Sequence, residues 1–178
     1  MKKTALRFAL VALPALFAAS CGGDNLFGTL DGGTTGGTCP AGVTIYRVAD
    51  NTYPAVAGSA MINSDTCNTG IKASDLESNR RVKNDAQGNI TLYSADNTTV
   101  IGAGPVRCNT GTLTYGPVQI TDGVCRFSAE YSVSFTATAD NAFTVQVTQT
   151  RTNPMSEAGQ TCLQPQSCSV SYKVSQKL

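Results

Sequence analysis

The stretch FSAEYSVSFTATADNAFTVQVTQT, residues 127–150, decides the fold class. From Phe127 to Ala137 every second residue is apolar, and the residues between are Ser, Glu or Thr. The same alternation returns at Phe143 and continues through Val147. Successive side chains of a strand point to opposite faces, so a period of two is typical of a strand with one buried face. The stretch therefore predicts a long antiparallel hairpin.

The length of its turn follows from the register, because directly opposite residues of an antiparallel pair lie on the same face. A two-residue loop would place Phe135 opposite a polar residue. A three-residue loop over 139–141 places Phe135 opposite Val145, and it pairs Ala137 with Phe143 and Val133 with Val147. It also puts Asn141 where a left-handed backbone is required, which asparagine tolerates. We expect the three-residue loop.

Other segments predict further strands and one short helix. A second hairpin is expected over 81–93, with a loop at 86–88 and Val82 opposite Leu92. Single strands are expected at 43–48, 99–102, 112–120 and 168–174. Ser74 and Glu77 fit a capping box, which predicts a helix of two turns at most.

These elements indicate an all-β domain. Many short strands separated by Gly, Asn and Pro favour an antiparallel β-sandwich or a small barrel, with at most one short helix. Residues 39–178 number about 140, a usual size for one domain. We expect a single β domain there.

The N-terminus has the layout of a secretory signal peptide. Lys2, Lys3 and Arg7 precede an apolar run at 9–19 that is too short to span a membrane. The tetrapeptide Ala18-Ala19-Ser20-Cys21 resembles the lipobox of bacterial lipoproteins, although the family's usual leucine is replaced by Ala18. The resemblance implies that residues 1–20 are removed, that Cys21 carries a diacylglycerol on its sulfur, and that its amine is acylated. The alternative is an ordinary thiol beside an ordinary cleavage site.

Residues 21–38 are expected to form the lipidated cysteine and a flexible tether. Seven of the 17 residues from 22 to 38 are glycine, and such a chain spans about 20 to 25 Å as a random coil. In enteric bacteria an aspartate after the lipidated cysteine retains lipoproteins at the inner membrane. Gly22 stands there in this chain, so the resemblance implies an exported, palmitate-bearing protein of the outer membrane where the cell has one.

Cysteine parity fits the lipid anchor. With Cys21 lipidated, an even number remains: Cys39, Cys67, Cys108, Cys125, Cys162 and Cys168. In an exported chain this predicts three disulfides, for which sequence alone allows 15 connectivities. Short spacing favours a bridge between Cys162 and Cys168, and next one between Cys108 and Cys125. The repeated Cys-Asn-Thr-Gly at 67–70 and 108–111 is interpreted as two disulfide-anchored turns rather than a duplication.

The sequence carries little recognisable chemistry. It has no histidine and no CxxC pair, which removes histidine-dependent catalysis, zinc ribbons and thioredoxin-type redox chemistry. No phosphate-binding glycine motif is present in the mature region, and no cofactor or metal is expected. Without the three basic residues at 2, 3 and 7, 10 basic residues face 12 acidic ones, a charge of −2 that does not favour nucleic acid as a partner.

Several charged residues remain as candidates. A carboxylate-dependent hydrolase would need two acids close together, and the acids in question are Glu77, Glu130, Asp122 and Asp140. Glu130 falls on the polar side of its strand, where surface exposure is expected. The pairs Asp96-Asn97 and Asp50-Asn51 are interpreted as turns. The basic cluster Arg80, Arg81 and Lys83 is interpreted as a solvated face, and most aromatic residues as core.

The expected function is therefore non-enzymatic. We expect a lipid-anchored exported protein with a structural or interaction role in the bacterial envelope, contacting an envelope protein or glycan. The alternative is a small β module that binds a ligand or glycan or inhibits a hydrolase. A carboxylate-dependent hydrolase is the third possibility.

Overall fold

The protein is described by a computed structural model covering residues 39–85, 87–156, 161–163 and 165–178. The predicted signal peptide at 1–20 and the predicted lipidated Cys21 with its tether at 21–38 lie outside these residues. Within them, no helix is long and apolar enough to cross a membrane.

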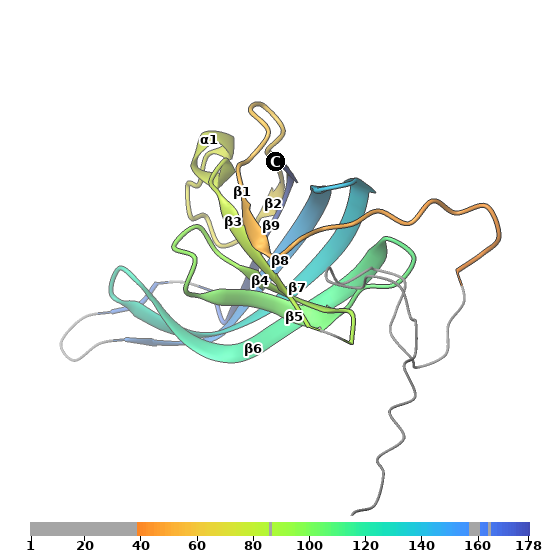
Figure 1. The fold of residues 1–178 in the computed structure, drawn as a ribbon. Helices are drawn as coiled ribbons and strands as arrows, with labels where there is room; N and C mark the ends of the chain where they lie inside the picture. Colours follow the sequence, from red (N-terminus) through yellow and green to blue (C-terminus); the bar gives the residue numbers. More distant parts are fainter. Residues whose placement is uncertain (1–38, 86, 157–160, 164) are drawn as a thin grey trace, which may run out of the picture.

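Nine antiparallel strands form one curled sheet with the shape of a half-barrel (Figure 1). Their order is β1-β3-β4-β5-β6-β7-β8-β9-β2. The elements are β1 (Asn51–Tyr53), β2 (Met61–Asp65), α1 (Ala73–Leu76), β3 (Arg80–Asn84), β4 (Asn89–Tyr93), β5 (Val100–Pro105), β6 (Thr110–Asp122), β7 (Cys125–Ala139), β8 (Ala142–Ser156) and β9 (Ser167–Lys177). The all-β prediction is confirmed, and of the two expected architectures the single curled sheet is the barrel-like one.

The register of the long hairpin is confirmed. In β7 and β8, Phe135 lies opposite Val145, and the pairs Ala137 with Phe143 and Val133 with Val147 form as expected. Asn141 has φ 54° and supplies the left-handed turn residue. The loop itself differs from the expected one: Ala139 pairs with Ala142, so the loop holds only Asp140 and Asn141, and a bulge between Ala137 and Ala139 takes up the third residue. The alternating apolar residues at 127–137 and 143–147 therefore share the inner face.

The second hairpin, between β3 and β4, also has the expected register. Val82 lies opposite Leu92, and Gly88 turns the chain with φ 79°. The carboxylate of Asp85 accepts hydrogen bonds from the backbone N–H groups of Gln87 and Asn89, at 2.9 and 2.8 Å. Position 86 of the predicted loop lies outside the described residues.

The curl brings the two ends of the sheet together beside the β7–β8 turn. Immediately after β1, Ala55 forms a bridge with Gln176 of β9. The N–H of Val56 donates to the carbonyl of Ser175 at 2.9 Å, and the N–H of Lys177 donates to that of Pro54 at 3.1 Å. This end of the half-barrel is thus closed by backbone hydrogen bonds.

An aromatic cluster fills the closed end. Phe143 stacks on Phe135 with ring centroids 4.9 Å apart, and it meets the edge of Tyr53 at 5.0 Å. All three side chains are buried. The Tyr53 hydroxyl donates to the carbonyl of Ala49 at 2.9 Å, and burial raises the pKa of Tyr53 to about 12. The prediction that these aromatic residues belong to the core is confirmed.

The expected strand at 43–48 does not form. This segment crosses the closed end, and side chains from two turns take the place of a neighbouring strand. Asn109 accepts from the N–H of Tyr46 at 2.8 Å and donates to the carbonyl of Thr44 at 2.7 Å. Asp140 accepts from the N–H of Arg47 at 2.8 Å. The alternation at 43–48 therefore buries Val48 without forming a ladder.

The one short helix is confirmed, but it begins earlier than expected. α1 is a single turn with Lys72 at its N-cap, and the Asp75 carboxylate accepts from the Lys72 N–H at 3.0 Å. The cap thus lies two residues before the predicted Ser74 and Glu77 pair. Glu77 instead follows the helix.

All six predicted cysteines form disulfides, but both preferred pairings are wrong. The bridges are Cys39–Cys108, Cys67–Cys168 and Cys125–Cys162. A bridge between Cys108 and Cys125 is impossible because the 13 residues of β6 separate them, about 40 Å of extended chain. Cys168 cannot prefer Cys162 because β9 pairs with β2, which brings Cys168 beside Cys67. The interpretation of both Cys-Asn-Thr-Gly segments as disulfide-anchored turns is confirmed, with Asn68 and Asn109 at positive φ.

These bridges predict a ranked loss of stability. Replacing Cys67 and Cys168 together by serine opens a loop of 101 residues, which should lower the free energy of unfolding by about 4 to 5 kcal/mol. Replacing Cys125 and Cys162 opens a loop of 37 residues, and its loss should be about 1 kcal/mol smaller. Urea unfolding measures both losses, and non-reducing peptide mapping checks the pairs. A peptide linking Cys162 to Cys168 would contradict the fold.

Candidate functional site

The inner face of the half-barrel holds a pocket between the aromatic cluster and the far ends of β6, β7 and β8. Its volume is about 480 Å³, within the range of small-molecule sites. The apolar part of its wall is Ile71, Leu76, Ile101 and Val170. Its polar part includes Tyr131, Gln149, Arg151 and Tyr172. We call this cavity the inner pocket.

The strand alternation places these polar side chains. Tyr131 of β7 lies opposite Gln149 of β8, and Tyr172 of β9 lies opposite Val147. Gln149 and Arg151 continue the inner-facing row that starts at Phe143. The same face that packs the core at the closed end therefore becomes polar further along the strands.

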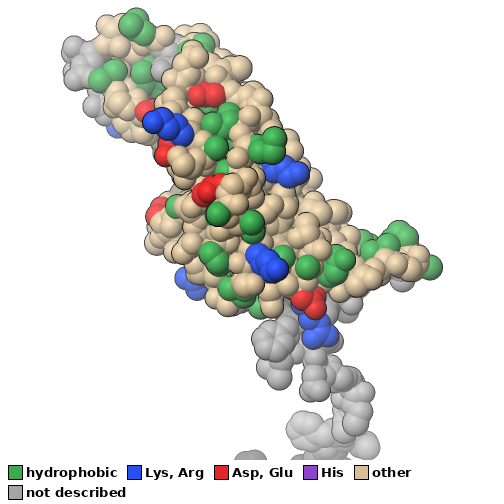
Figure 2. Space-filling model, turned by 90° about the horizontal axis from the view of Figure 1, so that it is seen from above, with side chains coloured by type: hydrophobic (Ala, Val, Ile, Leu, Met, Phe, Trp, Pro, Cys, Tyr) green, Lys and Arg blue, Asp and Glu red, His purple; other side chains and the backbone are tan. Residues whose placement is uncertain are grey.

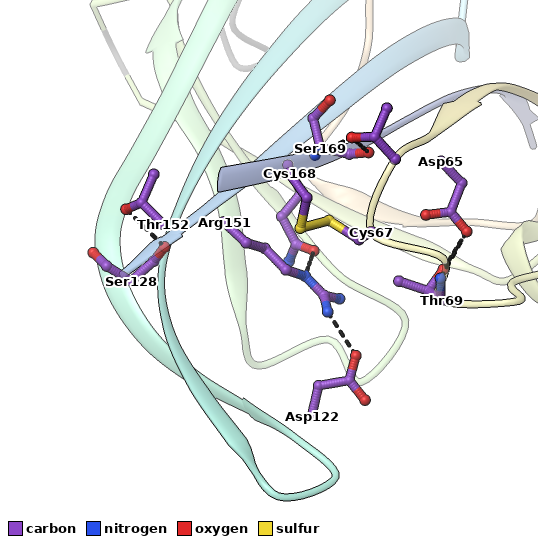
Figure 3. Close-up of a disulfide and its surroundings, with 11 residues drawn as sticks. Asp65, Cys67, Thr69, Asp122, Ser128, Arg151, Thr152, Cys168 and Ser169 are labelled. Atoms are coloured by element: carbon purple, nitrogen blue, oxygen red, sulfur yellow. Dashed lines mark hydrogen bonds and ion pairs between the residues drawn. A yellow bond between two sulfur atoms is a disulfide. The ribbon is translucent and has the colours of Figure 1, made fainter. Parts of the chain in front are cut away.

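Hydrogen bonds fix the polar wall in place. The Nη1 of Arg151 donates to Asp122 at 2.6 Å, and its Nε donates to the Oε1 of Gln149 at 2.9 Å. Gln149 in turn donates through Nε2 to the Tyr131 hydroxyl at 2.6 Å. Figure 3 shows Arg151 beside the Cys67–Cys168 disulfide, with its guanidinium directed to Asp122. These hydrogen bonds restrict the side chains of Arg151, Gln149 and Tyr131 to few rotamers.

Arg151 is also held from its other side. Its guanidinium carbon lies 5.5 Å from the ring centre of Phe127, within the distance of a cation–π contact. The side chain is only 13% exposed. Arg151 therefore belongs to the wall of the inner pocket rather than to the outer surface.

A second arginine lies behind the pocket. Arg80 of β3 points to the inner face and is 4% exposed. Its Nη1 donates to the Ser78 hydroxyl at 2.6 Å, while its Nε has no hydrogen-bond partner. Among the described residues, the only ion pair is Arg151 with Asp122, so Arg80 has no carboxylate partner there.

Arg80 acts on the pocket through Tyr172. Burial raises the pKa of Tyr172, and the positive charge of Arg80 opposes that rise. The two groups are thus close neighbours. Because Tyr172 lines the pocket, a buried positive charge stands directly behind one of its polar groups.

The residues of the predicted basic cluster lie on opposite faces of the sheet. The interpretation as a solvated face is wrong for Arg80, because residues 80 and 82 of β3 face inward. Arg81 and Lys83 lie at the outer face, near the ring of Tyr93 at 5.9 and 5.8 Å.

The candidate acids do not form a pair. Glu77 accepts from the N–H of Ala60 at 3.3 Å, Asp140 accepts from Arg47, and Asp122 binds Arg151. Glu130 is exposed and lines a separate outer pocket of about 310 Å³. Neither this outer pocket nor the inner pocket is lined by two carboxylates. The structure therefore gives hydrolysis by two carboxylates no support in these cavities.

The predicted turn at Asp96 is present. Its carboxylate accepts from Thr99, Thr98 and Ser94 in the connection between β4 and β5. These hydrogen bonds, the Thr99 hydroxyl first, hold the pKa of Asp96 well below its usual range. Asp96 thus has a local structural role.

Sequence reasoning missed the inner pocket. Tyr131 and Tyr172 were assigned with the other aromatic residues to the core. The sequence nevertheless contains a signal. Gln149 and Arg151 stand at positions where the alternation of this strand predicts apolar residues. A polar residue at such a position needs a partner when buried, and here the partners form the site.

No protein-family model matches this chain, and neither a curated protein nor a solved structure does. The function is therefore argued from the pocket and the sequence alone.

Proposed function

We propose that this protein is an exported, lipid-anchored binding protein that holds a small ligand in the inner pocket. The observation that carries the proposal is the convergence of fixed polar side chains with an apolar wall on the concave face. Elsewhere that face is packed with core residues. Preformed apolar cavities with a few oriented polar groups are the usual form of ligand sites.

Two features support a role without catalysis. The chain has no histidine, and the polar groups of the inner pocket are phenols, an amide and a guanidinium rather than an acid and base pair. Its only carboxylate is Asp75, which accepts hydrogen bonds from the N–H of Lys72 and the hydroxyl of Ser74. Such a wall is suited to binding and orientation.

The disulfides support the lipid anchor. Six of the seven cysteines bond to one another, which leaves no cysteine in the chain for Cys21 to pair with. This is the arrangement that a lipidated Cys21 requires. With two or three acyl chains the anchor would be stable, since each buried methylene contributes about 0.8 kcal/mol.

Ligand binding at the inner pocket has a direct test. In protein with isotope-labelled Ile and Val methyl groups, a soluble fragment library should shift the signals of Ile71, Ile101 and Val170. The exposed Val43 and Val56 lie outside the pocket and serve as internal controls. If no fragment at about 1 mM shifts the pocket methyls, the pocket is not a ligand site.

The anchor has its own test. Replacing Cys21 by serine should abolish incorporation of labelled palmitate and release the protein from membranes, because the acylated sulfur is gone. Serine at Cys162 is the matched control, since that cysteine is bonded to Cys125, and labelling should persist. Equal labelling of the Cys21→Ser variant and the wild type would refute the anchor.

A second candidate function is contact with an envelope protein or glycan through β2. This strand is the edge of the sheet, and its Met61 and Ile62 side chains are 61% and 37% exposed. Edge strands present unpaired backbone groups that another chain can bind.

Contact through β2 predicts a position-dependent cross-link. A photo-reactive residue at Met61 should capture the same envelope component in repeated experiments on intact cells. The same residue at Val43, which is exposed away from the sheet edge, should not capture it. Equal capture from both positions, or none from Met61, would count against an interface at β2.

A further inference from the structure

We infer that the ligand of the inner pocket is a small amphipathic anion. Its carboxylate or phosphate group would accept hydrogen bonds from Tyr131, Tyr172 and Arg151, and its apolar part would pack on Ile71, Ile101 and Val170. This inference rests on the proposed function, because it names the chemistry of the same pocket's ligand.

The polar side chains of the wall keep hydrogens that they can donate to a ligand, given the contacts that they already make. The Tyr131 oxygen already accepts from Gln149 at 2.6 Å, so its hydroxyl hydrogen is directed elsewhere. The Arg80 guanidinium, which lies beside Tyr172, has donors only, so it offers the hydroxyl hydrogen of Tyr172 no acceptor. The hydrogen of Tyr172 is therefore also available to a ligand.

Arg151 contributes in the same sense. Its Nη1 and Nε bond to Asp122 and Gln149, which leaves the Nη2 hydrogens for a group in the pocket. A wall with these donors matches a ligand rich in acceptor oxygens. Hydrogen bonds to a charged acceptor are also stronger than those to a neutral one.

The charge balance favours an anion over a neutral acceptor. Arg151 is balanced by Asp122, and the carboxylate of Asp75 lies exposed at the rim and is bonded to its own helix turn. Arg80 is not balanced by any described carboxylate, and its Nε lacks a partner. A buried charge without a partner is costly. An anion on Tyr172 would offset that cost.

The apolar wall makes the ligand amphipathic. Ile71 is half-buried and presents apolar surface to the cavity, and Leu76, Ile101 and Val170 lie deeper in the same wall. An inorganic anion would leave this surface in contact with water. A ligand with an alkyl or aryl body would bury it, at roughly 25 cal/mol per Å².

Three probes that share one body test the inference. Phenylbutyrate, phenylbutyl phosphate and phenylbutanol are titrated into the full-length protein by calorimetry at one ionic strength. We expect the carboxylate, the phosphate or both to bind at least tenfold more tightly than the alcohol. The stronger of the two identifies the head group.

Matched variants locate the effect. Tyr172→Phe removes one donor and keeps the ring, so it should weaken the preferred anion about tenfold. The alcohol should lose less, because its neutral oxygen accepts a weaker hydrogen bond. Arg80→Met should likewise reduce the preference for the anion. Tyr93→Phe and Arg81→Met carry the same changes at the outer face and should bind as the wild type does. Circular dichroism checks that each variant is folded.

The outcomes separate the two proposals. If the alcohol binds as tightly as the anions, the anionic ligand is refuted while the pocket remains a binding site. If fragments shift the pocket methyls but none of the three probes binds, the anionic class is again refuted. If neither fragments nor probes bind, the proposed function fails with it. An anion preference that Tyr172→Phe does not reduce would also overturn the inference.

Discussion

The register of β7 on β8 is the constraint on which the rest of the structure depends. Side chains alternate with a period of two, so a slip of one residue would move every inner side chain of these strands to the outer face. The left-handed turn at Asn141 fixes that register. The flanking strands β6 and β9 then pair on either side and inherit the same inner face. Core and pocket are both consequences of this one hairpin.

Along these strands the inner face changes from apolar to polar, while the alternation of the side chains stays the same. At the closed end Phe135 and Phe143 exclude water, whereas Tyr131, Gln149 and Arg151 occupy equivalent positions further along. A purely structural inner face would continue with apolar residues, since buried polar groups stabilise a fold less than apolar packing unless every partner is present. The Nε of Arg80 has no hydrogen-bond partner, which is therefore easier to explain in a ligand site than in a core.

The parts of the fold that sequence predicted are those governed by local rules. The registers at Phe135–Val145 and Val82–Leu92 follow from alternation and turn chemistry alone. The disulfide pairings do not follow from local rules, because Cys67 and Cys168 are 101 residues apart and meet only through the pairing of β2 with β9. The segment at 43–48 alternates as a strand does, but its backbone groups bond to the side chains of Asn109 and Asp140 and to the backbone of Asn141, which lie in distant turns. Long-range contacts of this kind leave no local pattern in a single sequence.

The inner pocket cannot be predicted from the sequence for a related reason. Tyrosine at an inward position is equally compatible with core and with a ligand wall, and the difference lies in what its hydroxyl meets. For Tyr53 the hydroxyl donates to the backbone of Ala49 and the residue is part of the core. For Tyr131 the Gln149 amide donates to the hydroxyl instead, and for Tyr172 the neighbouring Arg80 guanidinium offers the hydroxyl no acceptor, so both hydrogens are left for the cavity. The neighbours of the hydroxyl thus separate a structural tyrosine from one that can donate into the cavity, and these neighbours are Gln149 and Arg80, which the fold brings from other strands.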